Sequence, residues 1–192
     1  MKTFNYILKD KNVRDTIAFS SFYNEKNILI QIFSGEDENN FQKILDILAD
    51  ELPQAICIGA SSSYIIESSK IFLNNTVLSI SIFENTTIKG SYTILDSSYD
   101  NGVALSNNLI TSKSKIMILF ACTLNTNGDE FLEGIEKVNS DILIAGGLAS
   151  PLTNHNNSFV SFGKKIYTQG MVGVSLNSDI LKVYNDLRYN WM

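Results

Sequence analysis

The chain has 192 residues, a formal net charge of −5 and a sequence pI of about 4.9. This length suits one large domain or two small, intimately packed domains, and folding would bury roughly 70% of the surface of the unfolded chain. Only two arginines are present and the lysines are scattered, which argues against a nucleic-acid partner because phosphate backbones are bound by clustered basic side chains.

Histidine and cysteine are rare, which limits the chemistry further. The single histidine, His155, excludes sites built from several histidines and most Ser-His-Asp arrangements. Cys57 and Cys122 lie in or at the end of apolar strands and form no CxxC motif, so we interpret them as reduced core residues. No apolar run has the pattern of a signal peptide or the length of a membrane span. We therefore expect a soluble, cytoplasmic protein without membrane contact.

The first half of the chain alternates strand-like and helix-like patterns. The apolar residues within 1–27 follow no single helical spacing, so we predict a short leading strand or an irregular arm there. A buried strand at 28–33 leads into a helix at 38–50, which three carboxylates precede and Pro53 stops. A second apolar strand then runs into Gly59 and three serines. Alternating strands follow at 77–83 and 88–95.

The second half repeats this order after a short predicted helix at 96–110. A strand at 116–121 leads into a helix at 127–138, and the next apolar strand runs into a glycine pair at 146–147. We predict further strands at 158–162, 165–168, 171–176 and 181–184.

This repetition indicates an internal pseudo-duplication with halves at about 28–95 and 116–185. Gly59 and Gly146 occupy the same place in each half, 87 positions apart (146 − 59). Two unrelated βαβ units would share part of this pattern, so chance similarity is the alternative interpretation.

We predict the α/β class, with mixed sheets in which each half contributes a parallel βαβ element and an antiparallel extension. The helices at 38–50 and 127–138 should then cover equivalent faces. Periodicity leaves open whether the two halves form one continuous sheet or two stacked sheets.

Several separated motifs are similar to one known family. They are Ile58-Gly59-Ala60-Ser61-Ser62, Leu78–Thr86, Ala145-Gly146-Gly147-Leu148-Ala149, Lys165–Val174 and Asn190-Trp191. Together they resemble the FIST N domain over residues 27–192. The resemblance implies a ligand-sensing domain of a bacterial signal-transduction protein, normally followed by a FIST C domain and coupled to a downstream output domain.

The same resemblance suggests how the chain is organised. Residues 1–27 would be an N-terminal arm and residues 28–192 the sensory domain. The chain ends where the family continues toward its second domain, so we expect a fragment that precedes a FIST C-like domain.

The resemblance also implies a small polar ligand, such as an amino acid, in a cleft between the halves. Glycine-rich loops let the backbone approach a ligand, and strand ends in parallel sheets commonly border pockets. The planar guanidinium of Arg188 suits a ligand carboxylate. We predict ligand contacts from Ser61, Ser62, Ser63, Asn125, Gly146, Gly147, Leu148 and Arg188. No cofactor or metal ion is predicted.

Structural interpretations of these residues remain open. The serine run fits an ordinary polar turn, Asn127 with Glu130 fits a helix cap, and Arg188 fits a surface charge. Both glycine loops also depart from the family pattern, because Ser63-Tyr64 lacks the family's second glycine and acidic residue, and Ser150-Pro151 replaces a Gly-Asp pair.

Two other functions compete with a non-enzymatic sensor. A serine-dependent hydrolase would use one of the three serines with His155 or a carboxylate as its base. A protein-interaction or dimerisation module would use the repeated strands as its surface and bind no small ligand.

Overall fold

The computed structural model describes residues 1–8, 12–67, 69–152 and 158–185. In chain order the elements are β1 (Lys2–Leu8), α1 (Val13–Thr16), the 3-10 helix η1 (Phe19–Ser21), β2 (Ile28–Ser34), α2 (Glu38–Glu51), β3 (Ile56–Ser61), β4 (Ile65–Glu67), β5 (Lys70–Phe72), β6 (Thr76–Ile82), β7 (Thr87–Thr93), α3 (Ser98–Leu109), β8 (Ser114–Ala121), α4 (Gly128–Val138), β9 (Leu143–Leu148), β10 (Val160–Phe162), β11 (Lys165–Tyr167) and β12 (Met171–Asn177).

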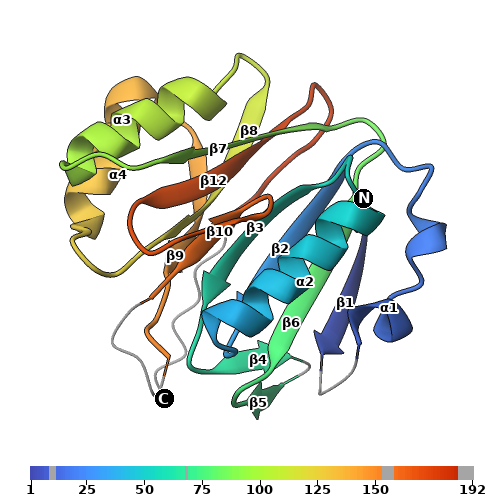
Figure 1. The fold of residues 1–192 in the computed structure, drawn as a ribbon. Coiled ribbons are helices and arrows are strands. Elements are labelled where there is room, and N and C mark those ends of the chain that lie inside the picture. Colours follow the sequence, from blue (N-terminus) through green and yellow to red (C-terminus); the bar gives the residue numbers. More distant parts are fainter. Residues whose placement is uncertain (9–11, 68, 153–157, 186–192) are drawn as a thin grey trace, which may run out of the picture.

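Two mixed sheets contain most of these strands (Figure 1). The first sheet has six strands in the order β1-β6-β2-β3-β10-β11, and the second has four in the order β7-β12-β8-β9. Within them β2 and β3 are parallel, as are β8 and β9, and the remaining neighbours are antiparallel. The predicted α/β class with mixed sheets is therefore confirmed. The separate pair β4 and β5 forms a small hairpin.

The two sheets stack face to face, with helices on their outer sides (Figure 1). Leu29, Ile58 and Val172 belong to the core between the sheets, where the rings of Phe33 and Phe120 meet edge to face at 5.2 Å. The alternate residues of each strand face outward. Those of β2 pack under α2, and those of β8 pack under α3 and α4. The chain thus forms four layers, helix, sheet, sheet and helix.

The helices begin where polar side chains satisfy their first N–H groups. A carboxylate oxygen of Asp37 accepts from the N–H of Asn40 at 3.0 Å before α2, and the Ser97 hydroxyl accepts from the N–H of Asp100 before α3. Asn127 caps α4 in the same way, as the alternative interpretation of that residue suggested.

The two halves of the structure, residues 2–82 and residues 87–177 without the hairpin of β10 and β11, share one strand arrangement. The order β1-β6-β2-β3 in the first sheet matches β7-β12-β8-β9 in the second, with the same relative directions. Leu29 pairs with Ile56 in the first half, and Ile116 pairs with Leu143 in the second, so both partners are shifted by 87 positions (116 − 29 and 143 − 56). Descent of the halves from one ancestral unit stays a prediction.

The structure differs from the sequence-based expectation in three places. The stretch at 181–184 forms no strand, because the Ser178 hydroxyl accepts from the N–H groups of Ile180 and Leu181 and turns the chain. The boundaries of the predicted halves also shift, because β7, expected in the half 28–95, lies in the second sheet beside β12, whereas the expected leading strand forms β1 of the first sheet. The hairpin of β10 and β11 joins the first sheet, although it follows the second glycine loop in the sequence.

Candidate functional site

The three predicted serines at the end of β3 form hydrogen bonds with main-chain groups of the protein. Ser61 is buried, and its hydroxyl donates to the carbonyl of Ser150 at 2.7 Å and accepts from the N–H of Phe159 at 3.0 Å. The hydroxyl of Ser63 donates to the carbonyl of Pro151, and that of Ser62 donates to the carbonyl of Tyr64. Each of the three hydroxyls therefore donates its hydrogen bond to a main-chain carbonyl group.

The serine run also ties the two halves of the chain to each other. The N–H of Ser63 donates to the Ser150 hydroxyl at 2.8 Å, and the N–H of Ser150 donates to the carbonyl of Ser61 at 3.0 Å. The two glycine-containing strands, β3 and β9, thus end beside each other, as expected for loops at the same end of two stacked sheets. These contacts link the loops directly, and the serines line neither of the two cavities described below.

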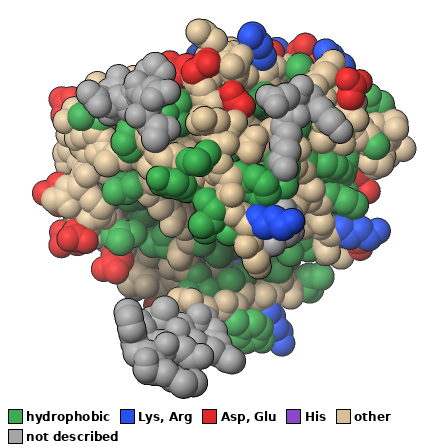
Figure 2. Space-filling view, turned by 90° about the horizontal axis from the view of Figure 1, so that it is seen from below, with side chains coloured by type: hydrophobic (Ala, Val, Ile, Leu, Met, Phe, Trp, Pro, Cys, Tyr) green, Lys and Arg blue, Asp and Glu red, His purple; other side chains and the backbone are tan. Residues whose placement is uncertain are grey.

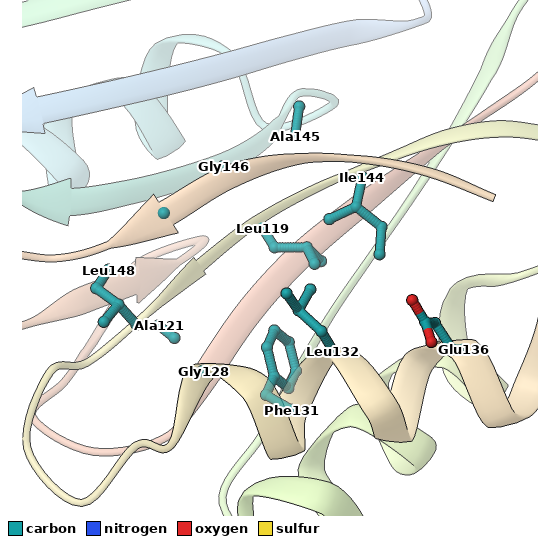
Figure 3. Close-up of a pocket in the computed structure, with 11 residues that line it drawn as sticks. Leu119, Ala121, Gly128, Phe131, Leu132, Glu136, Ile144, Ala145, Gly146 and Leu148 are labelled. Atoms are coloured by element: carbon teal, nitrogen blue, oxygen red, sulfur yellow. The ribbon is translucent and has the colours of Figure 1, made fainter. Parts of the chain in front are cut away.

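The predicted glycine pair lies in β9, at an apolar cavity of about 440 Å³ between this strand and α4 (Figure 3). Phe131 and Leu132 face the cavity from α4, and the Glu136 carboxylate stands at one end of it. Gly146 has a φ of 142°, and a side chain there would collide with the main chain of Leu119. Gly147 has open space around it. The remaining predicted member, Leu148, is 52% exposed at the cavity.

Asn125 lies at a different cavity, a polar one of about 460 Å³. This cavity is formed where β7 and β8 end and where β12 begins, next to the first turns of α3 and α4. Asn125 has a φ of 59°, a left-handed conformation that asparagine tolerates better than most residues, and it turns the loop between β8 and α4. The position of this residue beside a pocket agrees with the expected location at strand ends.

One side of the polar cavity is fixed by hydrogen bonds. Asn101 is only 3% exposed. Its side-chain oxygen Oδ1 accepts from the N–H of Leu95, and its side-chain nitrogen Nδ2 donates to the main-chain carbonyls of Leu95 and Ser97. The N–H of Asn127 donates to the Ser98 hydroxyl at 2.9 Å, which holds the beginnings of α3 and α4 together. The cavity therefore has a preorganised wall.

The rest of the polar lining is free to bind a ligand. Four polar side chains have no hydrogen-bond partner among the described residues: Asp96, Asn125, Thr126 and Gln169. Apolar side chains of Ile94, Leu95 and Leu124 lie at the same cavity and are about half exposed, at 47%, 50% and 50%. Figure 2 views the molecule from below and shows hydrophobic side chains exposed among polar ones on that face. The cavity can offer one carboxylate, two amides and a hydroxyl beside an apolar surface.

The structure separates the predicted site into parts. The serines join the two loops, the glycine pair with Leu148 lines the apolar cavity, and Asn125 lines the polar one. Arg188 and His155 lie outside the described residues. Sequence reasoning missed Asp96 and Gln169 as site candidates, because each reads locally as a turn residue and nothing in the sequence places them together.

The thiols of the two cysteines are buried away from solvent. Burial raises the pKa of the Cys57 thiol to about 12 and that of Cys122 to about 11. Both are free and buried, which confirms their interpretation as reduced core residues. The described residues contain no group of three or more histidine, cysteine, aspartate or glutamate side chains that could hold a metal ion. None of the described helices is long and apolar enough to span a membrane.

Comparison with known proteins identifies the family. The family model of the FIST N domain matches residues 28–191, a range that contains the β2-α2-β3 and β8-α4-β9 units and all the lining residues of both cavities. No curated protein matches the chain. Since the match spans most of the sequence, the chain belongs to the FIST N domain family, a family of sensory domains in signal-transduction proteins.

Proposed function

We propose that this chain is a non-enzymatic sensory domain that binds a small polar molecule in the polar cavity at the ends of β7 and β8. The observation that carries the proposal is the set of four unpartnered polar side chains beside a preorganised wall. A ligand pocket typically combines a few convergent polar groups with apolar surface, and this cavity has both.

The lining chemistry favours a free amino acid with an aliphatic side chain. The carboxylate of Asp96 is suited to a ligand ammonium group, because a charge-assisted hydrogen bond is stronger than a neutral one. The amide N–H groups of Asn125 and Gln169 can donate to the ligand carboxylate. Ile94, Leu95 and Leu124 provide the apolar surface for the side chain. No lysine or arginine lines the described cavity, which disfavours a polyanionic ligand.

Signal output would follow from a change in the relative position of three segments. The cavity is formed by residues 94–96, 124–126 and 169–170, which come from different parts of the second sheet. A ligand that contacts all three would favour the arrangement in which they lie closest. Only a difference in affinity between two arrangements can transmit the signal to an output domain.

The test is thermal unfolding of the chain with the standard free L-amino acids, organic acids and nucleosides. A ligand at about 100 times its Kd stabilises the folded state by ~2.7 kcal/mol, which corresponds to an increase in Tm of roughly 5 to 11 °C for a protein of this size. We expect such an increase for aliphatic amino acids and none for organic acids that lack an ammonium group.

Variants locate the binding site. Asp96→Asn should abolish the increase in Tm, and Asn125→Gly should reduce it, because glycine keeps the left-handed backbone and removes only the amide. Asp141→Asn is the matched control, since Asp141 is an exposed carboxylate at the opposite end of the second sheet. An unchanged response in Asp96→Asn, or no response to any amino acid, would contradict the proposal.

A further inference from the structure

Among the described residues that line the polar cavity, none offers a positive charge to a ligand carboxylate. Asp96 is the charged residue of this lining, and the amides of Asn125 and Gln169 are neutral donors. A free amino acid bound with its ammonium group on Asp96 would bring its own carboxylate close to a second carboxylate. Neutral amides can bind that group, but they do not cancel its charge. The cavity therefore matches the ammonium end of an amino acid better than its carboxylate end.

The two helices that begin beside the cavity do not supply the missing positive charge. A helix N-terminus attracts anions through its free N–H groups and its dipole. The described first turns of α3 and α4 contribute only Asn101 to the lining, and its N–H already donates to the carbonyl of Ser97 at 3.0 Å.

Both first turns also carry acidic side chains. Asp100 lies in the first turn of α3, and Asp129 and Glu130 lie in that of α4. All three are exposed, and none forms an ion pair with another described residue. Carboxylates at these positions offset the helix dipoles. The charged side chains at this end of the second sheet therefore favour a ligand with a net positive charge.

The cavity is also open enough for a ligand that continues out of it. Its apolar lining residues, Ile94, Leu95 and Leu124, are about half exposed, and the side chains of Asp96 and Gln169 are exposed as well. A pocket for a whole small molecule usually buries roughly 70–90% of the ligand surface. An open cavity of about 460 Å³ instead suits one end of a longer molecule whose other end stays in solvent.

We propose that the polar cavity binds the N-terminal residue of a short peptide, with an aliphatic side chain, more tightly than the free amino acid. This rests on the proposed function, from which it keeps the ammonium group at Asp96 and the side chain at the apolar surface. In a peptide an amide replaces the carboxylate. Its neutral carbonyl accepts from the N–H groups of Asn125 and Gln169 and leaves no charge to compensate. The rest of the peptide leaves through the open side of the cavity.

Isothermal titration calorimetry with the whole chain compares three forms of one residue: the free amino acid, its amide, and the tripeptide in which two glycines follow it. Leucine, isoleucine and valine are each tested at about pH 6, where an α-amino group with a pKa of about 7.7–8.0 is protonated. We expect the amide and the tripeptide to bind about tenfold more tightly than the free amino acid, because the repulsion between the ligand carboxylate and Asp96 is absent. The N-acetylated amide lacks the ammonium group and should not bind.

Gln169→Lys supplies the missing cation. The side chain of Gln169 is exposed and has no hydrogen-bond partner among the described residues, so the substitution removes no contact of the fold. The ratio of the Kd of the free amino acid to that of its amide should fall at least about tenfold in this variant. Asn107→Lys is the matched control, because it adds the same charge to an exposed residue near the opposite end of α3 and should keep the ratio of the natural chain.

The results separate this inference from the proposed function. If the free amino acid binds as tightly as its amide, or if the tripeptide binds more weakly than the free amino acid, the inference is wrong and the proposed function stands. An unchanged ratio in Gln169→Lys also overturns the inference. If none of the three forms binds, both are wrong. A preference for the amide and the tripeptide, lost in Gln169→Lys and kept in Asn107→Lys, would support the inference.

Discussion

Replacing Ser61 by alanine tests whether the serine run after β3 has a structural role. The Ser61 hydroxyl is the hydrogen-bond partner of two main-chain groups, the N–H of Phe159 and the carbonyl of Ser150. The side chain is only 1% exposed, so water does not readily replace it. Ser61→Ala keeps the size of the residue and removes both bonds, while it creates almost no cavity.

The expected cost follows from the two groups that lose a partner. A buried polar group without a hydrogen bond costs ~1–3 kcal/mol, which gives about 2 to 6 kcal/mol for two groups. Because the bond to Ser150 is only partly buried, we expect the free energy of unfolding to fall by an amount in the lower part of this range, about 2 to 4 kcal/mol. For a chain of this length the decrease in Tm is roughly 6 to 12 °C at the middle of that range. Ser62→Ala is the matched control, because the hydroxyl of Ser62 makes one exposed bond to Tyr64, and its effect should stay within about 0.5 kcal/mol.

Urea denaturation followed by circular dichroism measures both variants under the same conditions. A structural role predicts that Ser61→Ala is clearly less stable than Ser62→Ala, while both still respond to any ligand of the polar cavity. Equal stabilities of the two variants would refute the reasoning. Loss of the ligand response in Ser61→Ala, with unchanged stability, would indicate that Ser61 contacts the ligand.

Two further outcomes follow from the packing of β9 and from the buried thiols. Gly146→Ala should lower the free energy of unfolding by about 2 kcal/mol or more in urea denaturation, because its backbone is left-handed and Leu119 blocks the space, whereas Gly147→Ala should change it by less than about 0.5 kcal/mol. Burial raises the pKa of Cys57 to about 12 and that of Cys122 to about 11, so neither should react with a thiol reagent at pH 8 until the chain is unfolded. Because the unfolded chain loses these protons from about pH 9, the free energy of unfolding should fall as the pH rises above 9, and Cys57→Ala should reduce that fall; rapid reaction of the folded chain would contradict this account.

Local patterns were sufficient to predict most of the longer elements, although not the short β4–β5 hairpin, and they wrongly predicted a strand at 181–184. The apolar spacing of Phe41, Ile44, Leu45 and Leu48 predicts α2, and all four side chains are buried. The alternation of Ser79 and Ser81 with apolar residues likewise predicts β6. Such patterns depend on neighbours within a few positions, so one sequence contains enough information for them.

The candidate site could not be predicted in the same way, because its members meet only through tertiary packing. Asp96, Asn125 and Gln169 come from three loops that are far apart in the sequence. The function of the Ser61 hydroxyl depends on Phe159, which is brought to it by the pairing of β10 with β3. The same long-range pairing decides that Gly59 is covered while Gly146 lines an open cavity.

The attachment of β10 to β3 has a consequence for the protein as it is synthesised. β3 is complete at Ser61, but the hairpin that covers its edge ends only at Tyr167, about 100 residues later. At ~5–20 residues per second, the ribosome needs roughly 5 to 20 s to supply that cover. During this interval the nascent first sheet has an unpaired, apolar edge of the kind that promotes aggregation. The edge of β3 therefore stays unpaired until the hairpin of β10 and β11 has been synthesised. Chaperone binding to β3 would be needed most in that interval.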